Sequence, residues 1–143
     1  IMQTNRPWII AGATTLTFEA RVEFNATLTT DAYVGLHQDT GAGNLIGIGK
    51  YSGNANWYCR TIKASASTVT DSGVALAAGQ WYIVKFVITT SSVLFYINGV
   101  LKATHTTNIP TVNLGAGIMN FIAGVSGGSI DVDYISCSSS GRM

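Results

Sequence analysis

Residues 16–24 read LTFEARVEF, an alternation of apolar and polar side chains. Successive side chains of a β-strand point to opposite faces, so this period of two predicts a strand that is buried on one face only. The predicted exposed face carries Thr17, Glu19, Arg21 and Glu23. The alternation therefore indicates a sheet that covers an apolar core.

Further runs rich in β-branched and aromatic residues follow along the chain, separated by Gly, Asn, Ser and Asp. We predict strands at residues 33–36, 45–50, 57–63, 80–89, 93–97, 100–106, 117–122 and 129–136. The segments between them predict turns, at residues 41–44, 52–54, 71–73, 89–92 and 124–128. Short strands joined by such turns are typical of an all-β, antiparallel β-sandwich.

The pair Asn98-Gly99 separates two β-rich arms, VLFYI and VLK. A two-residue type I′ turn needs positive φ at both central positions, which Asn and Gly adopt most easily, so we predict a hairpin here. Helical periodicity is weak, and only residues 74–78 are compatible with a helical turn. Residues 138–141 read as a polar tail after the last strand.

Length and charge limit the classes of function. The 143 residues predict a single β-sandwich domain over residues 1–143, with its core at about 16–136, and the start at Ile1 suggests a fragment of a longer protein. Eight Lys and Arg balance seven Asp and Glu without a basic run, so we expect no nucleic acid partner. No apolar run approaches the ~20 residues of a membrane-spanning helix, so we expect no membrane insertion.

The cysteines and histidines suggest no reactive site. Cys59 and Cys137 lie far apart without a second pair, which leaves open a disulfide or, more commonly, two separately buried thiols. His37 and His105 belong to no metal-ligand spacing and no nucleophile-base arrangement, so we expect both on the surface.

Several segments occur in a recognisable order: Gly79–Phe86, the hairpin 93–99, Ile109-Pro110, and a closing strand Ile130–Ile135 that contains Asp131, Asp133 and Tyr134. This order resembles the concanavalin A-like, or laminin-G-like, jelly-roll superfamily. Residues 57–61, WYCRT, are similar to variants found in virion proteins of tailed bacteriophages. The resemblance covers about residues 16–136 and implies two curved sheets packed face to face.

The resemblance implies a non-catalytic structural module of a virion, as a capsid decoration or a tail-fibre domain, that also binds glycan. Its partners would be other virion subunits and host-surface glycan, and we expect a homo-oligomer on the particle surface. The alternative is a secreted or cell-surface lectin-like module. A wholly architectural domain that contacts only protein is also consistent with the low charge.

A glycoside hydrolase of the laminarinase type is the third alternative. Such hydrolases on this fold hold two catalytic carboxylates at positions i and i+4 of a strand, in an ExDxE pattern. Glu19 and Glu23 have this spacing, but Arg21 stands where the central Asp belongs. A cation between the carboxylates would lower both pKa values, whereas a general acid needs a raised one. We therefore predict that the chain is not an enzyme.

The acidic and basic residues of the first and last strands have a structural interpretation. These strands commonly lie side by side in such sandwiches, which would place Glu19, Arg21 and Glu23 beside Asp131 and Asp133. We predict an ion-pair ladder in which Arg21 bridges acidic neighbours. Because laminin-G relatives often bind calcium, Asp131 and Asp133 could alternatively form half of a calcium site. Two carboxylates are too few ligands, so we expect no cofactor.

The aromatic residues offer a better candidate for recognition. If Trp57, Cys59 and Phe95 point into the core, then Tyr58, Arg60 and Tyr96 point away from it. Sugars stack their C–H faces on aromatic rings, while planar polar groups bind the hydroxyls. We predict that Tyr58, Arg60 and Tyr96 bind carbohydrate, and we assign Trp57, Trp81, Tyr82 and Tyr134 to packing in the core or at a sheet edge.

Overall fold

The computed structural model describes residues 15–24, 31–38, 43–51, 53–121 and 130–140, with only the backbone of 117–121. These residues form two antiparallel sheets of five strands each. The first sheet has the order β10 (Ile130–Ser140), β1 (Thr15–Phe24), β6 (Trp81–Thr89), β7 (Val93–Ile97) and β8 (Val100–His105). The second has the order β5 (Ala66–Ala75), β4 (Asn56–Lys63), β3 (Asn44–Lys50), β2 (Asp31–His37) and β9 (Gly115–Phe121).

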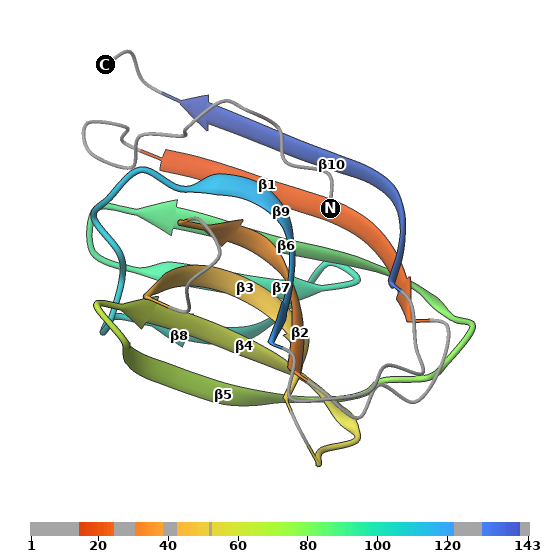
Figure 1. The fold of residues 1–143 in the computed structure, drawn as a ribbon. Coiled ribbons are helices and arrows are strands. Elements are labelled where there is room, and N and C mark those ends of the chain that lie inside the picture. The colour runs from red at the N-terminus through yellow and green to blue at the C-terminus, as the bar shows by residue number, and fades with distance from the viewer. Residues whose placement is uncertain (1–14, 25–30, 39–42, 52, 122–129, 141–143) are drawn as a thin grey trace.

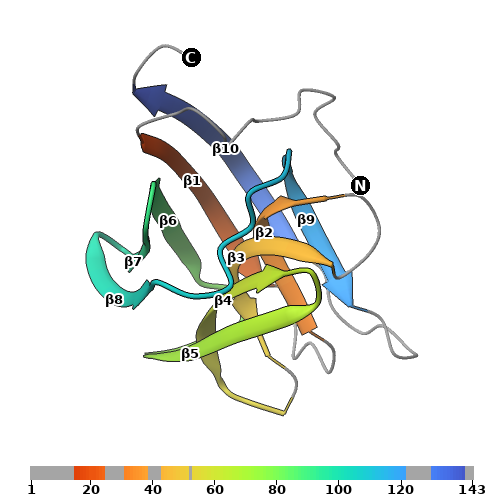
Figure 2. The same ribbon diagram turned by 90° about the vertical axis from the view of Figure 1, so that its left-hand side faces the viewer.

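The two sheets face each other as the layers of a sandwich (Figure 1). Turned by 90°, Figure 2 shows β6, β7 and β8 on the left and β2, β3 and β9 on the right. At the two open sides of the sandwich, β8 contacts β5 and β10 contacts β9. The prediction of an all-β, antiparallel sandwich is confirmed. Within the described residues there is no helix, and the segment compatible with a helical turn, 74–78, begins instead with Val74 and Ala75 at the end of β5.

The alternation in β1 buries every second side chain, as the sequence predicts. From this strand, Phe18 stacks on Phe86 of β6, with ring centroids 4.7 Å apart. Trp57 of the second sheet meets Phe24 at 4.8 Å and Tyr82 at 5.0 Å, both from the first sheet. One continuous apolar core therefore joins the two layers.

The Asn98-Gly99 turn joins β7 and β8, as predicted. Its φ angles are 49° at Asn98 and 81° at Gly99, both positive as a type I′ turn requires. The turn is also fixed to β6: the Ile83 amide donates to Oδ1 of Asn98 at 2.9 Å, and the Asn98 amide donates to the Ile83 carbonyl at 2.8 Å.

Strand β10 contains a bulge at Asp133. Its pairing with β1 moves from Arg21↔Tyr134 to Val22↔Val132, so Asp133 has no partner of its own in the register. A bulge of this kind inserts one residue and shifts the alternation of faces. Ile130 and Val132 pack on the core before it, and Ile135 and Cys137 do so after it. Asp133 and Tyr134, although neighbours, are consequently both exposed.

Two further segments differ from the sequence prediction. The tail predicted at residues 138–141 is wrong for Ser138 to Ser140, which pair with Thr17, Leu16 and Thr15 of β1. The turn predicted at 71–73 is also wrong, because these residues lie within β5, which the sequence did not predict. The predicted turn at 124–128 and parts of those at 41–44 and 52–54 lie outside the described residues, as do positions 122 and 129 of two predicted strands.

The predicted surface position of both histidines is wrong. His37 and His105 are buried, with 8% and 3% of their surface exposed. His105, at the end of β8, lies between the sheets: its Nδ1 is 3.1 Å from Thr61 Oγ1 and its Nε2 is 2.8 Å from Thr70 Oγ1. Both cysteines are free thiols, Cys59 in the core and Cys137 partly buried.

Candidate functional site

The three predicted carbohydrate-binding residues lie on two different sheets. Tyr58 and Arg60 belong to β4 in the second sheet and alternate with the buried Trp57 and Cys59, so their side chains leave the core. Tyr96 belongs to β7 in the first sheet, where its ring lies 5.3 Å from the Lys85 ammonium. The structure therefore brings Tyr58 and Arg60 together and separates Tyr96 from them.

Tyr58 is held by an acidic neighbour that the sequence analysis missed. Its hydroxyl donates to Oδ2 of Asp71 at 3.1 Å, because the register sets Tyr58 directly opposite Asp71 on β5. The same carboxylate accepts hydrogen bonds from the Gly73 amide at 2.8 Å and from Asn56 Nδ2 at 3.0 Å. These donors, led by Gly73, lower the pKa of Asp71, so the carboxylate is ionised at neutral pH.

Arg60 spans the sheet from β4 to β2. Its Nη1 lies 3.6 Å from Oδ2 of Asp31, and its guanidinium stands 5.5 Å from the ring centroids of Tyr33 and of Tyr51. Gly47 of β3 lies opposite Arg60 in the register. A residue without a side chain there lets the arginine cross the intervening strand. Arg60 retains 16% exposure of its side chain.

We call Tyr51, Asn56, Tyr58, Arg60 and Asp71 the β4 cluster. Its two tyrosine rings lie 5.6 Å apart at a tilt of 38°. The remaining members are an amide, a guanidinium and a carboxylate, planar groups that bind pairs of hydroxyls. The cluster thus combines apolar ring faces with fixed hydrogen-bonding groups, the combination that carbohydrate requires.

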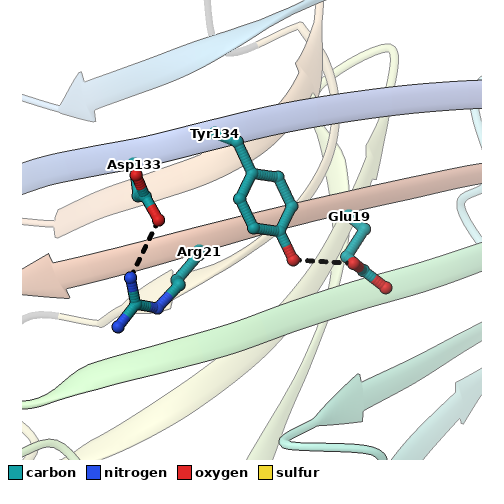
Figure 3. A network of polar contacts seen from close by, with 4 residues as sticks. All are labelled: Glu19, Arg21, Asp133 and Tyr134. Carbon is teal, nitrogen blue, oxygen red and sulfur yellow. Dashed lines mark hydrogen bonds and ion pairs between the residues drawn. The ribbon is translucent and has the colours of Figure 1, made fainter.

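The outer face of the first sheet carries a second polar network, shown in Figure 3. Arg21 of β1 donates to Oδ2 of Asp133 at 2.8 Å, so this ion pair of the predicted ladder is present. The Tyr134 hydroxyl donates to Oε1 of Glu19 at 2.8 Å. Glu23 lies opposite Asp131 in the register, which places two carboxylates side by side.

Two exposed aromatic residues on this face were assigned to packing by the sequence analysis. Trp81 is 36% exposed and Tyr134 is 37% exposed, whereas Trp57 and Tyr82 do lie in the core. The Arg21 guanidinium lies 4.7 Å from the centroid of the Trp81 ring. The break in alternation within Asp131-Val132-Asp133-Tyr134-Ile135 is the sequence signal that would have revealed the outward position of Tyr134.

The described residues were compared with the requirements of a metal centre and of a membrane-spanning helix. No group of three or more His, Cys, Asp or Glu side chains in that part of the chain is placed to hold a metal ion. Asp133, one half of the calcium site considered above, is paired with Arg21. In the same residues no helix has the length and apolar character needed to cross a membrane.

Comparison with sequence families gives a match to residues 2–135, nearly the whole chain, for the family described as SO2946-like, C-terminal domain. The chain belongs to this family. No curated protein matches it. Among solved structures, the SO2946 protein of unknown function from Shewanella oneidensis MR-1 is 20% identical, with a TM-score of 0.69. The match covers 92% of this SO2946-like chain and 60% of the Shewanella chain.

Other solved structures share the fold of this SO2946-like domain. The carbohydrate-binding module CBM66 from Bacillus subtilis is 13% identical, with a TM-score of 0.67 over 91% of this chain and 78% of that one. The galectin LEC-6 from Caenorhabditis elegans is 12% identical, with a TM-score of 0.64 over 99% of this chain and 92% of that one. Alginate lyases are similar as well. At these identities the similarity extends to the β-sandwich fold.

Proposed function

We propose that this SO2946-like domain is a non-catalytic carbohydrate-binding module and that the β4 cluster holds the glycan. The observation that carries the proposal is the placement of the Tyr51 and Tyr58 rings beside Arg60 and Asp71. The names of its structural neighbours, a carbohydrate-binding module and a galectin, support the same class of ligand.

In this proposal a pyranose ring stacks on Tyr58, and its hydroxyls bond to Asn56 and Arg60. Asp71 holds the Tyr58 hydroxyl and the Asn56 amide in place, so the site is organised before the ligand arrives. A small site of this kind binds weakly, and several copies on one particle or surface would raise the overall affinity.

We further propose that the module belongs to a surface assembly. The similarity of residues 57–61 to phage virion proteins supports a capsid decoration or a tail fibre, and the alternative is a secreted or cell-surface lectin-like module. Val100 and Leu101, 55% and 49% exposed on the edge strand β8, support contact with other virion subunits or a homo-oligomer. Electron microscopy of the source particle would test this setting; a uniformly intracellular distribution would contradict it.

The proposal is tested by substituting the β4 cluster. We expect Tyr58→Ala and Arg60→Ala each to weaken binding on a glycan array by about tenfold, because each removes a direct contact with the sugar. Tyr96→Ala is the matched control, since it removes a partly exposed tyrosine from the other sheet. A Tyr58→Ala/Arg60→Ala protein with full affinity for every bound glycan would refute this site.

The absence of catalysis is tested separately. The wild-type chain is incubated with alginate and with β-glucan, and new reducing ends and unsaturated uronates are measured. We expect neither product, since Arg21 separates Glu19 from Glu23 and donates to Asp133. Turnover that is abolished by Glu19→Gln would instead support a hydrolase.

A further inference from the structure

The Tyr134 ring is held flat against the outer face of the first sheet. Its side chain starts on β10, and its hydroxyl is bonded to Glu19 on β1 at 2.8 Å. Figure 3 shows the ring lying across β1 with one broad face turned outward. A ring fixed at both ends loses little conformational freedom when a ligand stacks on it.

The bulge in β10 sets a fixed polar pair beside this ring. Because Asp133 is the extra residue, it faces outward next to Tyr134 and accepts a hydrogen bond from Arg21. Arg21 in turn lies against Trp81 of β6. We call Glu19, Arg21, Trp81, Asp133 and Tyr134 the Tyr134 platform.

The spacing of the two aromatic residues limits the size of a ligand. Tyr134 lies opposite Arg21 in the register, and Trp81 lies opposite Glu23. Tyr134 and Trp81 are therefore two strands apart across the sheet and offset by two residues along it. With strands ~4.8 Å apart and a rise of ~3.4 Å per residue, their Cα atoms are about 12 Å apart. One pyranose ring is too short to contact both, whereas consecutive rings of an oligosaccharide can do so.

The charges on this face select against acidic ligands. Carboxylates of Glu19, Glu23, Asp131 and Asp133 outnumber the cations of Arg21 and Lys85 on strands β1, β6 and β10. Arg21 is already paired with Asp133. A uronate or sulfated sugar would therefore be repelled, while the hydroxyls of a neutral sugar can bond to both members of the ion pair.

We infer that the Tyr134 platform is a second glycan-binding site, specific for a neutral oligosaccharide of two or more pyranose rings. It shares no residue with the β4 cluster and lies on the outer face of the other sheet, so each site can be lost without the other. With both sites present, one domain bridges two glycan chains.

The test is a titration of the ¹⁵N-labelled chain, followed by NMR, with cellohexaose, maltohexaose and mannohexaose, and with hexagalacturonate as the charged counterpart. We expect at least one neutral hexaose to shift the Trp81 indole and Tyr134 amide signals. Tyr134→Ala should weaken that binding by about tenfold, and Tyr134→Phe, which keeps the ring and loses the bond to Glu19, by less. Tyr58→Ala is the matched control and should leave these shifts unchanged.

Four results would overturn the inference. The first is that no neutral hexaose shifts the Trp81 and Tyr134 signals. The second is that Tyr134→Ala, with an unchanged melting temperature, binds as tightly as wild type. The third is that hexagalacturonate shifts these signals as well as the neutral sugars do. The fourth is that these signals change with protein concentration in the absence of sugar, which would assign the face to self-association. Loss of binding at the β4 cluster in Tyr58→Ala, with the Trp81 and Tyr134 shifts unchanged, would support two independent sites.

Discussion

Among single residues, His105 has the environment most sensitive to pH. The Thr61 hydroxyl donates to the Thr107 carbonyl at 3.1 Å, so it accepts from Nδ1 of His105, and Nε2 is left to accept from the Thr70 hydroxyl. The ring also packs 4.9 Å from Phe95. These contacts suit a neutral imidazole, and burial lowers the pKa of His105 below its ordinary value of 6.5.

We predict that acid destabilises the fold through His105. Because the unfolded chain keeps the ordinary pKa, it binds the proton more readily than the folded chain. The free energy of unfolding should therefore be constant above about pH 7.5 and fall as the pH drops through about 6.5 toward the lower pKa of the folded state. Urea denaturation between about pH 5 and pH 8 measures this slope. The slope should vanish in His105→Gln; an unchanged slope would rule out His105 as its source.

At the same scale, the sequence predicted only part of each candidate site. Alternation along 57–63 correctly placed Tyr58 and Arg60 on an outer face. It could not reveal Asp71, because that residue joins Tyr58 through the register of β4 with β5, which local periodicity does not contain. The outward position of Tyr134 was missed for a different reason: the bulge reverses the alternation immediately before it.

Among the elements, β2 and β3 approach each other closely at their glycines. A Cβ atom on Gly35 would overlap the carbonyl oxygen of Ile46, and one on Gly49 would overlap that of Ala32. Backbone atoms cannot move aside as a flexible side chain can. The pairing of the two strands therefore requires glycine at both positions.

We predict that Gly35→Ala lowers the free energy of unfolding by about 3 kcal/mol, because the added methyl forces β2 and β3 apart. Gly43→Ala is the control, since a Cβ there meets no atom within 4 Å. Chemical denaturation of the two variants against wild type measures the difference. Equal stability of Gly35→Ala and Gly43→Ala would show that β2 and β3 can move apart without lowering the free energy of unfolding.

The strands themselves were predictable where one face is buried. Residues 16–24 and 93–97 alternate, and both form strands within a residue of the predicted bounds. Strand β5 was not predicted, because it lies at a sheet edge with most side chains exposed. Its sequence therefore has no alternation of apolar and polar residues. Ser138 to Ser140 were missed because three serines carry no pattern, and only pairing with β1 makes them a strand.

At the scale of the whole molecule, the two sheets close over the apolar core between them, and Cys59 lies inside it with no exposed surface. Burial raises the pKa of the Cys59 thiol to about 12, so the reactive thiolate does not form in the folded protein at neutral pH. Cys137 of β10 is partly buried, and its pKa is raised to about 11 by the same cause.

We predict that Cys59 reacts only when the sandwich opens. In a Cys137→Ala protein, a thiol reagent should label Cys59 at a rate that follows global unfolding and rises with denaturant. Cys59→Ala, which leaves Cys137, should label faster under native conditions, because β10 is an edge strand. Immediate labelling of Cys59 in the native protein would mean that the two layers separate far more easily than a shared core allows.

The extra residue in β10 can also be recognised in the amino-acid sequence alone. Two residues, Asp133 and Tyr134, separate the inward-facing Val132 and Ile135, whereas an unbroken strand would have one. A homologue with a single residue at this place has room for at most one of the two groups, a carboxylate or an aromatic ring. The number of residues between these two inward-facing positions can therefore be used to sort homologues from their sequences alone. Homologues with two residues there can form the Arg21–Asp133 pair beside an aromatic ring, and homologues with one cannot.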